Sequence, residues 1–456
     1  MCIIFLNTMH KISLRKKGGV DIIMHIKRHL NFTTLVNKIT SMVSEISDYR
    51  EQDRIDYSLC DCVMTGFAMM FFQDPSLAEF QRRLQKRVQQ NNLKTLFNVE
   101  KIPKESQMRD VIDEISFREL DPVFKDYFLS LQRYKHLERY QFLNGYYLVS
   151  MDGTNYFGSE KIHCPSCLIR EQTKGSIYYY HLIVQATLMH PDCRQVIPLS
   201  PEPAMNKDGN TKQDCELNAG KRLIDKIRRA HPRLKIIIVG DSLYSHQPFI
   251  EELRENKMSF ILVAKPGDHV ALMEWVKEIR EMGEMNRYEL KDSKGRELIY
   301  EWINNVPING KEKSIEVNYF EFWIKDNGKI TYHNSWVTDF TIDKENVVEL
   351  VRGGRSRWKI ENECFNTLKN HGYHIEHNFG HGKKNLSMNF FLLNLLAFFI
   401  HQIFELTCLL YQRCRNEFGS RKEYWNALRN LIRFLIFRSW EELLKFILSP
   451  PEPESG

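Results

Sequence analysis

The sequence predicts an α/β protein with a mixed sheet, a β-rich insertion and helical regions at both ends. Short apolar runs of strand length begin at Tyr146 and alternate with helical stretches up to residue 264. More strand-like runs follow between residues 268 and 345, including LIYEWINNV and SIEVNYFEFWIKD. The 456 residues exceed one ordinary domain, so we expect two or three folding units.

Residues 1–45 are basic and weakly patterned, which predicts a peripheral segment, and residues 46–145 are predicted to be helical. The stretch 59–72 is strongly apolar, and the next helix is expected to be capped by Asp74 with Pro75 at its first position. A further helix is expected near Ser106. A basic helix face has two interpretations, a solvated surface, which we favour, or a DNA contact; it consists of Arg82, Arg83, Lys86 and Arg87.

The central region predicts three strands, then a helix, a strand, a helix and a strand. The strand-like runs are 146–151, 177–189, 195–199, 235–240 and 259–264. The first three are expected to meander antiparallel, so the sheet is mixed rather than doubly wound. We assign residues 146–267 and 346–385 to one domain, interrupted by an all-β insertion at 268–345.

Residues 386–456 form a helical, aromatic-rich region with an expected disordered tail, PPEPESG. The run 390–404 is the most apolar in the chain, but it is shorter than the ~20 residues of a membrane span. Asn394, His401 and Gln402 also interrupt it, so we expect a buried helix and no membrane segment.

Composition and charge fit a cytoplasmic protein. The net charge of +6 allows nucleic acid as a partner without demanding it. Ten cysteines are scattered without a disulfide framework, which favours a reducing compartment. The N-terminal apolar patch precedes its positive charges, the reverse of a signal peptide, while Met9 and Met24 leave the translation start open.

Three acidic residues are the candidate catalytic groups. Asp152 follows an apolar run in YYLVSMDGT, Asp241 ends the run IIIVG, and Glu361 lies in the helical segment RGGRSRWKIENECF. Ligands collect at the carboxyl ends of strands in open α/β sheets, so two of these acids can converge. Phosphodiester cleavage by two metal ions needs such carboxylates, and Mg²⁺ prefers oxygen ligands.

Each acid also has a plainer interpretation. Asp152 followed by Gly153 is typical of a turn, and Asp241 could cap a helix. Glu361 could form only a surface ion pair with Arg357, four residues earlier. Glu363 is a rival ligand, but a two-residue offset turns it about 200° around a helix, so we favour Glu361.

The block RWKIE, preceded by DGT and GDSLYS, resembles the DDE transposases of bacterial insertion sequences. The resemblance runs from about residue 45 to 410 and includes IPKESQMRDVID and GRSRWKIENECFNTLKNHGYHIEHNFGHGKKN. It implies an RNase H-like fold with Asp152, Asp241 and Glu361 as the metal-binding triad. Two Mg²⁺ ions are implied, with Mn²⁺ as a substitute.

Within that family, the chain is similar to the group with a Tyr-Arg-Glu-Lys signature. Arg357 matches the Arg of this signature. The Tyr position is Gly354, and the Lys position is Leu368, with Lys369 one place late. Features tied to the signature, such as a hairpin intermediate at the transposon end, are therefore not implied here.

The resemblance implies cleavage at transposon ends and strand transfer to target DNA. The partners would be the terminal inverted repeats, recognised by the helices of 46–145, and the target duplex. A homodimer would pair two ends on the bacterial nucleoid. The alternatives are a metal-dependent DNA endonuclease without strand transfer and a non-catalytic DNA-binding protein derived from a transposase.

Basic residues near the acids are the predicted DNA contacts. Those around Glu361 and after it are Arg352, Arg355, Arg357, Lys359 and Lys369. Lys383 and Lys384 lie in GHGKKN, which is either an anion-binding loop at a helix start or a plain connecting loop. A further basic helix face contains Arg222, Lys226, Arg228 and Arg229.

Two clusters have metal-ligand residue types. Cys164 and Cys167 form a CxxC pair, but structural zinc needs four ligands and the sequence has no second CxxC, so reduced thiols are favoured. The second cluster consists of His371, His374, His377 and His381. Glycines between them break any helical register, so we favour phosphate contacts or core packing over a metal site.

Overall fold

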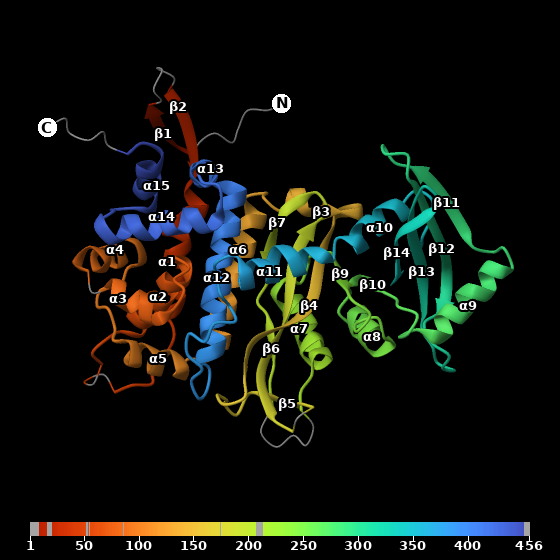
Figure 1. Cartoon of the computed structure of the whole chain (residues 1–456), viewed down its shortest axis with the longest axis horizontal. Coiled ribbons are helices and arrows are strands. Elements are labelled where there is room, and N and C mark those ends of the chain that lie inside the picture. Colours follow the sequence, from red (N-terminus) through yellow and green to blue (C-terminus); the bar gives the residue numbers. More distant parts are fainter. Residues whose placement is uncertain are drawn as a thin grey trace.

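A computed structural model describes residues 9–15, 21–51, 53, 55–84, 86–173, 175–206 and 213–450. The molecule is elongated: helices from both ends of the chain lie together on one side, a sheet occupies the middle, and the insertion forms the other side (Figure 1). The segment PPEPESG lies outside the described residues except for its first proline.

The central sheet is mixed, as the sequence predicts. β4 (Tyr146–Ser159) pairs antiparallel with β6 (Ile177–His190) and parallel with β9 (Ile236–Gly240). β9 pairs parallel with β10 (Ser259–Val263), and α7 (Glu216–Ala230) and α8 (Gln247–Glu255) precede these two strands. Shorter strands add to β4 and β6: β3 (Gln141–Phe142), β5 (Leu168–Glu171), β7 (Cys193–Pro198) and β8 (Glu202–Ala204).

The insertion continues the same sheet. Its last strand, β14 (Lys329–Thr338), pairs antiparallel with β10, so the sheet runs without a break from the centre into the insertion. The other strands are β11 (Asn286–Lys291), β12 (Glu297–Pro307) and β13 (Glu316–Asp326). The expectation of an all-β segment is wrong in one respect, because α9 (Val270–Glu281) begins it and buries Leu272 and Val276.

Helices from the two ends of the chain form one helical unit. α12 (Leu386–Thr407) packs against α2 (Leu59–Phe71) and α5 (Glu105–Glu114), and α14 (Arg421–Phe434) packs against α4 (Arg87–Phe97). The remaining elements of this side are the hairpin β1 (Met9–Arg15)–β2 (Asp21–Lys27), α3 (Leu77–Leu84), α6 (Asp121–Arg133), α13 (Leu409–Asn416) and α15 (Trp440–Leu448).

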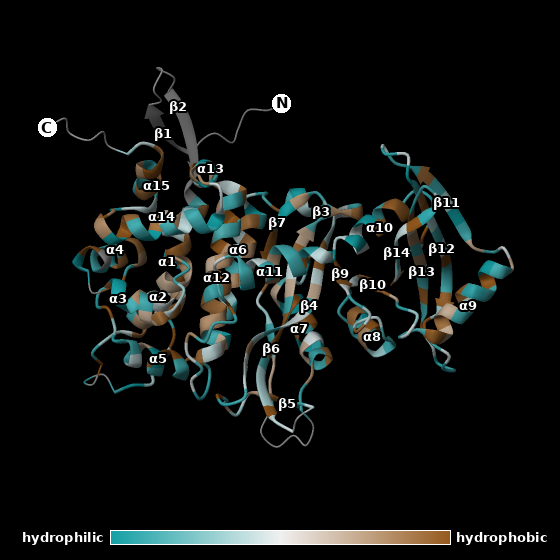
Figure 2. Cartoon of the chain, in the orientation of Figure 1, coloured by the Kyte–Doolittle hydropathy of each residue, from teal (hydrophilic) through white to brown (hydrophobic). Residues whose placement is uncertain are grey.

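The apolar run 390–404 lies in α12, which is a buried helix as predicted. α12 is long and apolar enough to cross a membrane by length and composition, but 89% of its most apolar window is buried inside the protein. Figure 2 shows α12, much of it brown, between the N-terminal helices and the sheet. This is the pattern of a core helix.

Two N-terminal expectations need correction. α1 (Phe32–Ser44) buries Leu35 and Ile39 in the core, so the peripheral segment is shorter than residues 1–45. Asp74 does not cap the following helix; it forms a buried ion pair with Arg83, while the Ser76 hydroxyl accepts the Glu79 backbone N–H. Arg83 therefore cannot belong to an exposed basic face.

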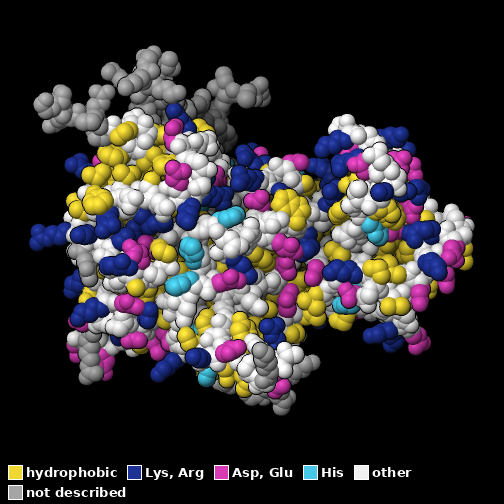
Figure 3. All heavy atoms as spheres, viewed as in Figure 1, with side chains coloured by type: hydrophobic (Ala, Val, Ile, Leu, Met, Phe, Trp, Pro, Cys, Tyr) yellow, Lys and Arg dark blue, Asp and Glu magenta, His cyan; other side chains and the backbone are white. Residues whose placement is uncertain are grey.

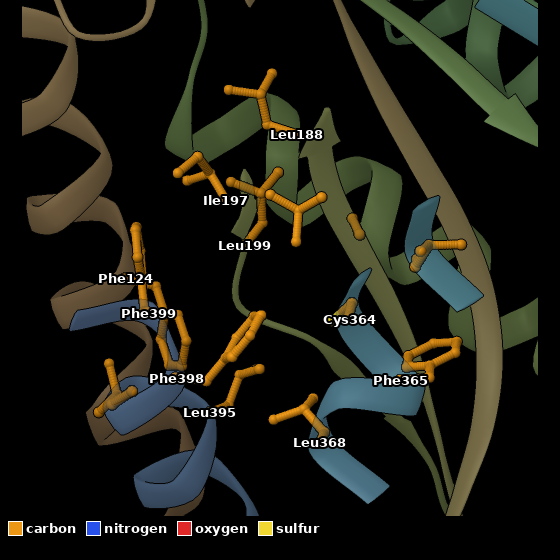
Figure 4. Close-up of a cluster of buried hydrophobic side chains, with 14 of the residues drawn as sticks. Phe124, Leu188, Ile197, Leu199, Cys364, Phe365, Leu368, Leu395, Phe398 and Phe399 are labelled. Carbon is orange, nitrogen blue, oxygen red and sulfur yellow. The ribbon is translucent and has the colours of Figure 1, made fainter. Parts of the chain in front are cut away.

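A buried hydrophobic cluster joins the sheet, the C-terminal helices and the segment after Glu361 (Figure 4). Leu188 and Ile197 from the sheet face Phe398 and Leu395 of α12 across the cluster, and Leu368 approaches from the other side. Full burial of one such side chain contributes roughly 1.5–3 kcal/mol. This packing holds the Glu361 segment against the sheet.

Candidate active site

The strand register brings Asp152 and Asp241 together. β4 and β9 pair from Tyr147↔Ile236 to Ser150↔Val239, an offset of 89 residues (236 − 147 = 89). Asp152 and Asp241 lie two residues beyond the last pair and have the same offset (241 − 152 = 89). Continuing the parallel register therefore sets the two carboxylates opposite each other on one face of the sheet.

The prediction that Asp152 lies at the carboxyl end of its strand is wrong, because it lies in the middle of β4. The strand continues to Ser159 because β6 pairs with it beyond this point, with Asp152 opposite Gln185. The turn interpretation of Asp152-Gly153 is thereby excluded.

Asp241 begins a tight turn after β9. Its Oδ1 accepts the Leu243 backbone N–H at 3.0 Å. The next helix, α8, begins at Gln247, and His246 is its N-cap residue. Asp241 therefore caps the turn and not the helix, and its second oxygen is not used in this contact.

Arg357 connects Glu361 to Asp152, because it contacts both carboxylates. The Arg357 guanidinium lies 3.4 Å from Oδ2 of Asp152 and 2.5 Å from Oε1 of Glu361. Glu361 lies on the π-helical segment η6 (Ile360–Phe365), a geometry that is frequent at functional sites. Glu363 instead lines a neighbouring cleft, so the two acids face different sites.

Negative charge is concentrated around Asp152. Burial is the main cause that raises its pKa, to about 7, while the Arg357 charge lowers it. The charges of Asp241, Glu216 and Glu361 raise it further. Buried like charges of this kind favour either protons or cations.

Glu216, at the start of α7, is a fourth carboxylate of the site that sequence reasoning missed. The Tyr244 hydroxyl donates to its Oε1 at 2.8 Å, and burial raises its pKa. A Cβ at Gly153 would lie 2.4 Å from the Glu216 carboxyl carbon, so any larger residue there would push this carboxylate out of its place. The two residues that surround Glu216, Tyr244 in GDSLYS and Gly153 in DGT, belong to motifs that the sequence analysis recognised. No sequence pattern connects either of them to Glu216.

The donor set fits divalent cations that prefer oxygen. Asp152, Asp241 and Glu361 would hold them, with Glu216 beside them, and all offer carboxylate oxygens only. Arg357 pairs with only two of the four carboxylates, so bound cations would relieve the excess of negative charge.

The basic residues around Glu361 that were predicted to contact DNA have different surroundings in the structure. Arg355 is exposed and stacks over Phe322 and Tyr332, while Arg352 pairs with Asp192. Lys359 is 5% exposed and donates to the Cys193 carbonyl at 2.9 Å, so its ammonium is engaged inside the protein and is not free for a DNA phosphate, against the prediction.

The predicted anion-binding loop GHGKKN is occupied by a carboxylate of the protein itself, that of Asp113. The Asp113 carboxylate accepts backbone N–H groups at 2.8–3.0 Å from Lys383, Lys384, Asn385 and Leu386. The side chain of Lys384 pairs with Glu114, and that of Lys369 with Glu376. The loop therefore cannot offer these N–H groups to a phosphate.

Three of the four basic residues predicted to form a face on α7 make contacts within the protein, and the fourth, Arg229, is exposed. Arg222 pairs with Glu202 and Asp214, and Lys226 pairs with Asp121. Arg228 donates to several carbonyls at the end of the helix. These charges hold α7 to its neighbours.

A basic cleft of about 1140 Å³ lies next to the acids, between α14 and the Glu361 segment. Figure 3 shows Lys and Arg side chains, with His side chains beside them, in the band between α14 and α11 (Asn366–Asn370). Trp358, which is 44% exposed, and Asn362 line it. Its basic lining residues are Arg194, Arg415, Arg421, Lys422 and Arg429.

The structure explains why the signature positions differ. A Cβ at Gly354 would lie 2.7 Å from the indole nitrogen of Trp336, so a tyrosine there would collide with this ring. Leu368 is 1% exposed and packs in the cluster of Figure 4, where a lysine would bury its charge. Lys369 points elsewhere, to Glu376.

Comparison with known families gives one match. Residues 205–399 match the model of a transposase DDE domain. The match includes Asp241 and Glu361, whereas Asp152 precedes it. No curated protein shows significant similarity to the chain.

Proposed function

Since residues 205–399 match the model of a transposase DDE domain, we propose that the protein cuts DNA at the ends of its element and joins them to target DNA. The reactions would take place at Asp152, Asp241 and Glu361. The observation that carries the proposal is the meeting of two adjacent strands and one helix at three carboxylates. Two of these carboxylates, those of Asp152 and Glu361, pair with Arg357.

The chain's own residues would hold and position the reacting groups. When bound, two Mg²⁺ ions would supply Lewis-acid chemistry and an activated water or 3′-hydroxyl. Asp152 and Asp241 come from paired strands, so their separation is fixed by the sheet. Glu361 is held by the packed helix, and Arg357 lies where the charge of a phosphate would need neutralising.

The basic cleft supports a path for the DNA backbone. It opens beside Asn362 and Glu363, next to the residue that carries the third carboxylate. Exposed Trp358 offers an indole face on which a base can stack. Binding through such a surface weakens as salt rises.

Pairing two DNA ends requires at least two active sites, so the active complex would be a homodimer. A surface that supports self-association is apolar: Phe434 is 68% exposed and Ile436 is 50% exposed. Figure 3 shows hydrophobic side chains gathered over α14 and α15.

The test is Mg²⁺-dependent cleavage of the DNA that flanks the reading frame. Asp152→Asn, Asp241→Asn and Glu361→Gln should each abolish cleavage and leave DNA binding intact. Glu255→Gln is the matched control and should retain cleavage, because this exposed acid at the end of α8 does not line the basic cleft. Full activity in all three variants would overturn the assignment of the site.

A second assay separates the alternatives. Pre-cut ends should be joined to a target duplex by the wild type. Cleavage without joining would identify a metal-dependent endonuclease. Binding without either reaction, together with unchanged activity of Asp152→Ala in cells, would identify a non-catalytic DNA-binding protein.

A further inference from the structure

Two cysteines and two histidines converge in a cluster away from the acids. Cys164 and Cys167 lie in the loop between β4 and β5, His181 lies on β6, and His381 lies between α11 and α12. Their four ligand atoms all lie within 4.8 Å of one another. His181 and His381 are 200 positions apart (381 − 181 = 200), so the fold alone brings them together.

The distances match those of a tetrahedral zinc site. Zn–S bonds of about 2.3 Å and Zn–N bonds of about 2.0–2.1 Å at tetrahedral angles put two sulfurs about 3.8 Å apart and a sulfur and a nitrogen about 3.5 Å apart. The Cys164 and Cys167 sulfurs are 3.8 Å apart. Cys167 Sγ lies 3.5 Å from Nε2 of both His181 and His381, and Cys164 Sγ lies 3.5 Å from Nε2 of His181.

The surroundings hold the four side chains in place. Cys167, His181 and His381 are buried, and Cys164 is half-buried. The ring of Phe157 packs 4.2 Å from that of His381, and Tyr156 stacks on His181 at 5.6 Å between centroids. The Cys164 backbone N–H lies 3.4 Å from Cys167 Sγ and Asn206 donates to the Cys167 carbonyl at 2.8 Å, so the loop is ordered.

Other occupants fit less well. The sulfurs are too far apart for a disulfide, and both cysteines are free thiols. An iron–sulfur cluster would divide the ligands between two irons, whereas here every ligand atom is within 4.8 Å of the others. Thiols alone would leave two buried imidazoles facing weak S–H donors.

We propose that Cys164, Cys167, His181 and His381 bind one structural Zn²⁺ ion. Four protein ligands close the coordination sphere, so the ion has a structural role. It would tie the end of the β4–β6 pair to the loop that leads into α12. The site is chemically distinct from the carboxylate site, whose oxygen ligands favour harder cations.

Metal analysis of the purified full-length protein tests the proposal. We expect about one zinc per chain after dialysis without added metal. Protein produced with Co²⁺ should show the visible absorption of tetrahedral thiolate-bound cobalt. Wild type without zinc and without this cobalt spectrum, or with a Cys164–Cys167 disulfide found by mass spectrometry, would overturn the proposal.

Variants locate the ion and separate it from the catalytic proposal. Cys164→Ser and His381→Ala should lose most of the zinc and lower the Tm by at least about 5 °C. Cys215→Ser, an exposed thiol outside the cluster, should keep both. Asp152→Asn should also keep its zinc, even though cleavage is lost, and loss of zinc in this variant would place the ion at the acids and refute the proposal.

Discussion

Asp113 offers a direct test of how the loop before α12 is held. Its carboxylate accepts four backbone N–H groups, and these are its principal contacts with residues 383–386. Asp113→Ala would leave all four donors without this partner. The two N–H groups of Lys383 and Lys384 lie in an exposed part of the loop and can be hydrated, whereas those of Asn385 and Leu386 are partly buried.

The size of the effect follows from the two partly buried donors. Each loses a charge-assisted hydrogen bond, and such bonds contribute about 1.5–3 kcal/mol, which partial hydration reduces. We expect Asp113→Ala to lower the free energy of unfolding by about 2–4 kcal/mol. Asp113→Asn should have a smaller effect, because one oxygen can still accept.

Urea denaturation followed by circular dichroism measures this difference. The control is Glu114→Ala, which removes the neighbouring carboxylate that pairs with the exposed side chain of Lys384. A surface pair of this kind contributes about 0–1 kcal/mol. If Asp113→Ala and Glu114→Ala shift the urea midpoint equally, the four N–H contacts do not stabilise the loop.

The pH dependence has a defined sign. Burial raises the pKa of Asp113, but the four N–H donors outweigh it and leave the pKa below its ordinary value. The contribution of Asp113 is therefore complete above the unfolded pKa of about 4 and is lost as pH falls through the lower folded pKa. The stability difference between wild type and Asp113→Asn should shrink in that acidic window, and a difference that grows there would refute the assignment.

Three further results are expected. Gly153→Ala should reduce cleavage strongly while DNA binding persists, because the new methyl group meets the Glu216 carboxylate; unchanged cleavage would contradict this. Mg²⁺ affinity, measured by calorimetry, should fall as pH drops below about 7, since a proton competes for Asp152; a pH-independent affinity would exclude this competition. Gly354→Tyr should lower the Tm through collision with Trp336, and a stable variant would show that the indole can move.

The sequence predicted the order of the elements well where local patterns determine them. Continuous apolar runs such as 236–240 predicted buried strands, and the long apolar run 390–404 predicted a buried helix. The extent of β4 was not predictable, because residues after Asp152 join the strand through pairing with β6. Helix α9 was missed since the strand signals after it dominated that region.

The candidate site was predicted unevenly for a similar reason. Asp152 and Asp241 follow recognisable apolar runs, and their separation of 89 residues equals the register offset, which only the pairing reveals. Glu216 has no such local signal, because its role depends on Tyr244 and on the missing side chain of Gly153. Among the basic residues, the charge of Lys359 is evident from the sequence, but its hydrogen bond to the Cys193 carbonyl is not.

The same limit applies to the proposed zinc ligands. Cys164 and Cys167 carried a recognisable spacing, but His181 lies within a strand and His381 in a distant loop, so no spacing connects them. Tertiary structure supplies the connection: pairing of β4 with β6 sets His181 beside the cysteine loop, and Asp113 fixes the loop that contains His381. If both proposals hold, the chain would separate its metal chemistry by ligand type, with oxygen donors where phosphate would react and sulfur and nitrogen donors that hold the fold.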